Sequence, residues 1–215
     1  MKNVYIYCEG QTEETFINEI LVPYFANIDI YVTPIVCTTS RNKNKKFKGG
    51  VSHYDKIKSE LTLLCKQHHN EYFTTMFDYY AMPSNTPNID DNTPDIYQRI
   101  TNIEKAIELD IGMNNCFFNL MLHEFEGILF SNPNSFFLIT NEDNVRKVIK
   151  MRESAETPEH INNSPETAPS KRLESIIPNY AKMKNGAILA KDMGIDVIMQ
   201  ECKHFAEWIE KIKKL

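Results

Sequence analysis

The stretch VYIYCEGQTE, residues 4–13, decides the fold, because it joins a strand pattern to a helix pattern through a single glycine. Residues 3–8 are rich in apolar and aromatic side chains, as in a buried strand, and residues 12–26 repeat apolar side chains at helical spacing. Gly10 allows the sharp turn between the two. A strand that turns directly into a helix opens a βαβ unit, so the stretch predicts an α/β protein.

The same alternation continues through the first 125 or so residues. The run CFFNLML, residues 116–122, is nearly continuously apolar and is typical of a parallel strand buried on both faces. We therefore predict a mainly parallel central sheet flanked by helices. The expected strands are 29–37, 72–78 and 116–122, the expected helices are 53–68 and 95–110, and the proline-containing segment 82–94 is expected to be a loop.

From about residue 124 the pattern is helical. Helices are expected at 124–131, 143–152, 170–177, near 186–193 and at 195–213, with a polar loop at 153–168. We therefore expect one compact unit with two parts, an α/β core over residues 1–130 and a helical C-terminal extension over residues 131–215 packed on it.

Bulk composition restricts the class of protein. The 215 residues carry a net charge of −5, from 24 basic and 29 acidic side chains, which does not suit tight DNA binding through bulk charge. No apolar run approaches the roughly 18 residues that cross a bilayer. The N-terminus enters a strand without the pattern of a signal peptide. The five cysteines are an odd number without a CxxC pair and indicate free thiols. We expect a soluble, cytoplasmic protein without membrane contact.

Acidic side chains stand at three predicted strand ends, where an α/β sheet gathers its functional groups. Each has a structural alternative: the first-turn acids favour a helix dipole, and the others can cap a loop or begin a helix. The joint placement instead favours a site for Mg²⁺ or Mn²⁺, since hard cations take carboxylate oxygens and two such ions can clamp a phosphodiester. The candidate ligands are Glu9, Glu13, Asp78, Glu124 and Glu126.

Two basic segments are candidates for nucleic-acid contact. The first places Arg41, Lys43, Lys45, Lys46 and Lys48 in eight residues, and the second is the pair Lys171-Arg172. Such surfaces can guide a phosphate backbone, although a solvated loop and ordinary helix-surface charge are the alternatives. HEFE, residues 123–126, lacks the second histidine of a zinc-protease HExxH motif, and the sequence has no P-loop.

Several blocks of the sequence resemble known families. EGQTE after an N-terminal strand resembles the EGxTE opening of Toprim domains, which occur in topoisomerases, primases and nucleases of the overcoming-lysogenization-defect type. EGQTEETF, FDYY, HEFEGILF, APSKR, the stretch Tyr180-Ala-Lys182 with Gly186, and CKHFAEWI together resemble a bacterial domain-of-unknown-function family regarded as Toprim-like. The blocks span nearly the whole chain, and the resemblance implies a Toprim-like fold.

The resemblance also implies roles for individual residues. Glu9 matches the Toprim glutamate, a metal ligand or general acid/base, and Glu13 matches the second acid of EGxTE. Asp78 matches the first aspartate of the Toprim DxD, but Tyr80 replaces the second, which puts a second metal in doubt unless Glu124 or Glu126 compensates. Lys171 matches a lysine that stabilises transition-state charge, and Arg172 is placed to grip a flanking phosphate.

The leading hypothesis is a Mg²⁺-dependent nuclease acting on DNA or RNA. By analogy with Toprim-like nucleases, its partner would be a separate ABC- or AAA-type ATPase, in a system of phage defence. The alternative is a catalytically degenerate Toprim-like module that binds a partner ATPase or nucleic acid. Tyr80 favours this alternative, whereas Glu9, Glu13 and Asp78 argue against it. A phosphotransferase or primase-like nucleotidyl transferase would need a nucleotide pocket, of which the sequence gives no sign.

Overall fold

Four parallel strands form the sheet at the centre of the molecule. The computed structural model describes residues 2–37, 53–161 and 167–215. The sheet order is β2-β1-β3-β4, and every pairing is parallel. The prediction of an α/β protein with a parallel sheet flanked by helices is confirmed. The strands are β1 (Lys2–Cys8), β2 (Ile30–Val36), β3 (Tyr72–Asp78) and β4 (Leu120–Met121).

One face of the sheet is covered by the first helical segment and by the last helix. The first segment consists of α1 (Gln11–Phe16), a π-helical turn η1 (Ile17–Leu21) and α2 (Val22–Ala26). Val4 and Ile6 of β1 share one apolar cluster with residues of this segment and of α9 (Lys203–Lys213). Trp208 of α9 donates its indole N–H to Thr74 Oγ1 in β3 at 2.9 Å, which fixes α9 against the strand.

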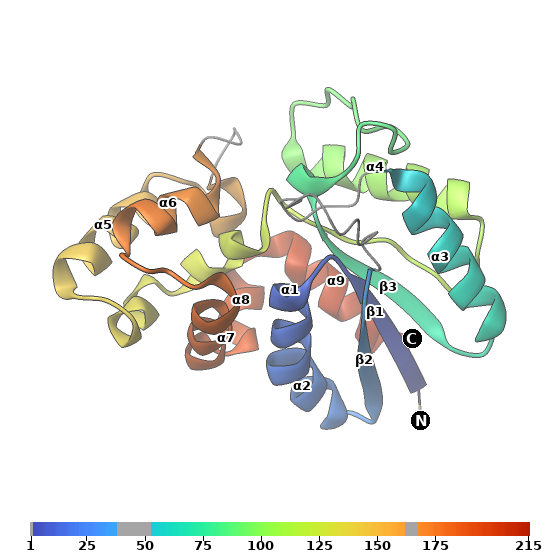
Figure 1. Ribbon diagram of the computed structural model, residues 1–215, viewed down its shortest axis with the longest axis horizontal. Helices are drawn as coiled ribbons and strands as arrows, with labels where there is room; N and C mark the ends of the chain where they lie inside the picture. Colours follow the sequence, from blue (N-terminus) through green and yellow to red (C-terminus); the bar gives the residue numbers. More distant parts are fainter. Residues whose placement is uncertain (1, 38–52, 162–166) are drawn as a thin grey trace, which may run out of the picture.

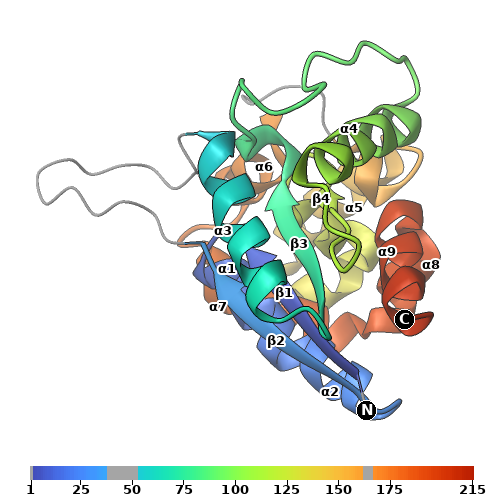
Figure 2. The same cartoon turned by 90° about the vertical axis from the view of Figure 1, so that its right-hand side faces the viewer.

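The opposite face is covered by α3 (Tyr54–Gln67) and α4 (Ile96–Ile111), which lie in front of β3 in Figure 2. Tyr7 and Phe77 point to this side and pack in a second apolar cluster with the two helices. The Asp95 side chain caps α4 by accepting the Gln98 N–H at 2.7 Å. Apolar packing on both faces explains why the strands read as nearly continuous apolar runs.

Apart from η2, which directly follows β3, the remaining elements are helical and extend to the left of the sheet in Figure 1. They begin with 3-10 helices where the sequence predicted a helix at 124–131. Among the described residues, no helix combines the length and the apolar character needed to cross a membrane. The elements are η2 (Tyr79–Ala81), η3 (Phe125–Ser131), η4 (Pro133–Leu138), α5 (Glu142–Glu153), η5 (Pro158–His160), α6 (Pro169–Ile176), α7 (Lys182–Met193) and α8 (Ile195–Glu201).

The prediction of one helix over 195–213 is wrong, because the chain breaks at Cys202, which has extended backbone angles of φ −118° and ψ 95°. The carboxylate of Glu159 makes the break possible. It accepts the N–H groups of His204 and Phe205, each at 3.0 Å, and so satisfies the free donors at the start of α9. This contact joins two segments more than forty residues apart, which local periodicity does not reveal.

The predicted strand 116–122 is also shorter than expected, with only Leu120–Met121 in the ladder and an isolated bridge from Cys116 to Phe73. Side chains replace the missing ladder bonds. The Asn119 N–H donates to the Thr75 hydroxyl, which in turn donates to the Asn119 carbonyl, both at 2.8 Å. Glu104 of α4 accepts the Leu120 N–H at 2.7 Å. The backbone is therefore satisfied without a regular strand.

Candidate metal centre

The first two candidate ligands lie where β1 turns into α1. Glu9 follows the last residue of β1, and one of its oxygens, Oε2, is buried without a hydrogen-bond partner among the described residues. Glu13 lies in the first turn of α1 and is 8% exposed. Its Oε2 accepts the Gly10 N–H at 3.0 Å, so Glu13 also caps its own helix. Both carboxylates therefore stay at the sheet edge.

The other three carboxylates come from the ends of β3 and β4. Asp78 is the last residue of β3, and its Oδ1 accepts the Phe125 N–H at 2.8 Å. Glu124 Oε2 accepts the N–H of Ser170 at the start of α6, at 3.0 Å. Glu126 is only 2% exposed. Each of these side chains is thus held by a neighbouring segment rather than left to solvent.

The five carboxylates affect one another electrostatically and are here called the acidic cluster. Burial raises the pKa of Asp78 well above its usual value, and the charges of Glu13, Glu126, Glu9 and Glu124 raise it further. Burial, followed by the charge of Glu13, raises the pKa of Glu9 to about 7. Like charges this close favour either protonation or a bound cation.

A lysine that sequence reasoning left without a role neutralises part of this charge. Lys182 opens α7, and its Nζ lies 3.2 Å from Glu126 Oε1. Burial disfavours its charge, but Glu126, Glu124 and Asp78 outweigh burial and raise its pKa. The pKa of Glu126 is nevertheless raised, because its burial exceeds the effect of Lys182. The stretch Tyr180-Ala-Lys182 is one of the blocks that resemble the family, but nothing in it predicts that Lys182 pairs with the carboxylates.

The acidic cluster fits a hard divalent cation in chemistry. All of its donors are carboxylate oxygens, and the partnerless Glu9 Oε2 is the kind of buried acceptor that a cation would satisfy. In the described part of the chain, no group of three His, Cys, Asp or Glu side chains has the arrangement needed to hold a metal ion. Binding would therefore require side-chain rotation, with Glu9, Asp78 and Glu126 as the residues that would hold the ion.

Comparisons with known proteins give a family. A model described as "Domain of unknown function (DUF4276)" matches residues 8–213. The chain belongs to this family. No curated protein matches it. A solved structure of the C-terminal region of the OLD protein from Xanthomonas campestris pv. campestris is similar at 14% identity and a TM-score of 0.40, covering 96% of this chain and 95% of that one.

In this DUF4276 member, two of the predicted cations, Lys171 and Arg172, pair outside the acidic cluster. Lys171 is on α6, its side chain is 60% exposed, and its Nζ pairs with Glu174 at 2.8 Å. Arg172 donates its Nε to the Thr167 carbonyl at 2.7 Å. Lys182 is instead the lysine that contacts the cluster. The basic segment with Arg41, Lys43, Lys45, Lys46 and Lys48 lies outside the described residues.

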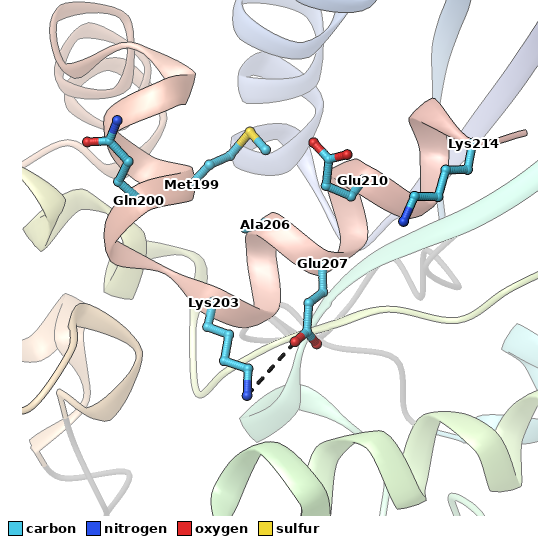
Figure 3. A pocket seen from close by; sticks show the side chains of 7 residues that line it. All are labelled: Met199, Gln200, Lys203, Ala206, Glu207, Glu210 and Lys214. Atoms are coloured by element: carbon cyan, nitrogen blue, oxygen red, sulfur yellow. Dashed lines mark ion pairs between the residues drawn. The ribbon is translucent and has the colours of Figure 1, made fainter.

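A surface hollow lies elsewhere in the molecule (Figure 3). It has a volume of about 510 Å³ and is lined only by residues of α8, α9 and the chain end. Lys203 and Glu207 face each other across 3.9 Å at its edge. None of the five carboxylates lines it, so the hollow and the acidic cluster are separate features.

Proposed function

We propose that this protein is a metal-dependent nuclease that hydrolyses phosphodiesters of DNA or RNA at the acidic cluster. One observation carries the proposal: acids from three strand ends of a parallel sheet share one electrostatic environment with one lysine. Structural ion pairs seldom gather five carboxylates around a single cation, whereas perturbed acids at the carboxyl ends of strands are typical of functional sites.

The side chains have distinct tasks in this proposal. Glu9, Asp78 and Glu126 hold Mg²⁺ or Mn²⁺, which when bound supplies charge neutralisation for a phosphate and a more acidic water. Lys182 carries positive charge toward the developing negative charge of the phosphoryl group. Glu13 and Glu124 orient the segments through their backbone hydrogen bonds.

The degenerate binding module is the second candidate, and two observations favour it. Glu13, Asp78, Glu124 and Glu126 each already have a partner within the protein. Tyr80 stands where the Toprim pattern has its second aspartate. In that case the cluster would be a structural device and the protein would act by binding a partner ATPase or nucleic acid.

A cleavage assay tests the proposal. Wild type, Glu9→Ala and the control Glu19→Ala are incubated with single-stranded DNA, duplex DNA and RNA, in Mg²⁺, Mn²⁺ or EDTA. Glu19 is an exposed acid on η1, so its replacement controls for the loss of one negative charge. We expect metal-dependent cleavage by wild type and Glu19→Ala only. Absence of cleavage together with absence of metal-induced stabilisation would support the binding module.

The same assay separates the two lysines. Lys182→Met should abolish cleavage, whereas Lys171→Met should leave it nearly unchanged, because Lys171 faces solvent beside Glu174. Stabilisation by metal without cleavage would indicate that the site binds metal but becomes active only with a separate ATPase, which is a further part of the proposal. A role in phage defence belongs to that same part and rests on analogy.

A further inference from the structure

Aromatic rings stand directly beside the acidic cluster. Tyr79 and Tyr80 follow Asp78, and their ring centroids are 5.9 Å apart with 30° between the ring planes. The ring of Tyr80 lies 5.0 Å from that of His123, the residue that precedes Glu124. The three rings, here called the ring platform, therefore join the two loops that carry carboxylates of the cluster.

The ring platform is held rigidly from below. The Tyr80 N–H donates to the His123 carbonyl at 3.2 Å, which ties the two loops together. His123 is 5% exposed and has a φ of 64°, a left-handed conformation that is costly for a residue other than glycine. Its buried Nδ1 has no partner in the described part of the chain. Tyr79 and Tyr80 are partly exposed above it.

The positive charge of Arg99 contributes to the electrostatic surroundings of two of these rings. Arg99 of α4 donates its Nε to the Thr93 carbonyl at 2.8 Å. Burial is the main reason that the pKa of His123 is lowered to about 4, and the charge of Arg99 adds to this effect. Arg99 also opposes the rise of the Tyr80 pKa that burial causes. No described carboxylate lies within ion-pairing distance of Arg99.

We infer that the ring platform binds an unpaired nucleotide, with its base stacked on Tyr79 and Tyr80. Stacking needs an uncovered base face, which single strands, loops and ends offer and a continuous duplex does not. This inference rests on the proposed function and names its substrate class: single-stranded nucleic acid. Tyr80, which departs from the acidic Toprim pattern, thereby gains a role of its own.

Binding to labelled oligonucleotides tests the inference without relying on cleavage. Fluorescence anisotropy, in EDTA and in Ca²⁺, compares a single strand, the same strand with abasic sites, and its duplex. Wild type should bind the base-bearing strand most tightly. Tyr80→Leu should weaken that binding by roughly 5- to 150-fold, the range for one stacked base, and leave abasic binding unchanged. Tyr80→Phe should keep the affinity, and so should Tyr31→Leu, a control at a tyrosine of β2 that is 44% exposed.

Three results would overturn the inference: equal binding of base-bearing and abasic strands, full affinity in Tyr80→Leu, or no binding of any strand. Thermal melting of each variant shows whether it is folded. If Tyr80→Leu does not fold, Tyr80→Phe still tests whether an aromatic ring at this position is enough for binding. Cleavage measured in parallel keeps the two proposals apart. Cleavage of base-bearing and abasic strands alike retains the nuclease and refutes the ring platform. Tyr80-dependent binding with neither cleavage nor stabilisation by Mg²⁺ or Mn²⁺ retains the ring platform and refutes the nuclease.

Discussion

The replacement Glu9→Gln should make the metal-free protein more stable at alkaline pH. The pKa of Glu9 rises from 4.5 to about 7 on folding, chiefly through burial and then through the charge of Glu13. A carboxyl with a raised pKa binds its proton more tightly in the folded state. Its contribution to stability is therefore complete below about pH 4.5 and is lost as the pH rises through about 7. Glutamine resembles the protonated acid and does not ionise.

The magnitude follows from the shift. At about 1.36 kcal/mol per pKa unit, the rise corresponds to roughly 3 kcal/mol in full, of which roughly 2 kcal/mol is lost between about pH 5.5 and pH 8. The free energy of unfolding of Glu9→Gln should thus exceed that of wild type by an amount that grows with pH over this range. The side chain of Glu9 is partly buried, so solvent screening does not remove the effect.

Urea unfolding followed by circular dichroism, in EDTA at several pH values, measures the difference. Glu19→Gln is the matched control, since it removes an exposed carboxylate from the same helical segment. Parallel pH profiles for wild type and Glu9→Gln would refute the reasoning, because burial in the acidic cluster would then have no energetic consequence. Adding Mg²⁺ should reverse the order by stabilising wild type at pH 8 and not Glu9→Gln.

Three further changes test other contacts. Lys182→Met leaves Glu126 buried without its cation and should cost roughly 2–4 kcal/mol of unfolding free energy at neutral pH; the double variant with Glu126→Gln should recover most of it in a urea-based double-mutant cycle. In Gly186→Ala the new Cβ would lie 2.9 Å from Phe125 Cε1, so the melting temperature should fall with a loss of about 1–3 kcal/mol, whereas in Gly127→Ala the nearest contacts are an ordinary 3.7 Å. Burial lowers the pKa of His204, but the hydrogen bond and charge of Glu104 outweigh burial and raise it. The contribution of His204 to stability is therefore complete below its pKa in the unfolded chain and is lost as the pH rises through its pKa in the folded protein. Glu104→Gln should therefore flatten the stability profile above the ordinary histidine pKa of about 6.5, and an unchanged slope would contradict this assignment.

The elements near the N-terminus could be predicted because each one follows its own local pattern. The strand pattern over 3–8 and the helix pattern over 53–68 correspond closely to Lys2–Cys8 and Tyr54–Gln67. The start of α7 was missed by four residues, since Lys182–Asn185 are polar or flexible and carry no apolar stripe. The break at Cys202 was missed because it depends on the distant carboxylate of Glu159.

The acidic cluster was predicted more fully than its counter-charge. Parallel strands bring their carboxyl ends to one edge, so acids at these ends lie along the same edge, where the other four raise the pKa of Asp78. The lysine depends on how α6 and α7 pack against η3, which the sequence does not specify. Both helices approach the cluster, but α6 contributes only the Ser170 N–H to it, while α7 contributes the Lys182 side chain.

The origin of the cluster in distant parts of the chain has a consequence for biosynthesis. The carboxylates lie between residues 9 and 126, whereas Lys182 follows more than fifty residues later. A growing polypeptide on the ribosome therefore has all five acids before it has the cation that compensates them. The last helix, which Trp208 fastens to β3, is added later still. A chain that stops before residue 182 would therefore contain buried acids without their cation and a sheet face that only the first helical segment covers.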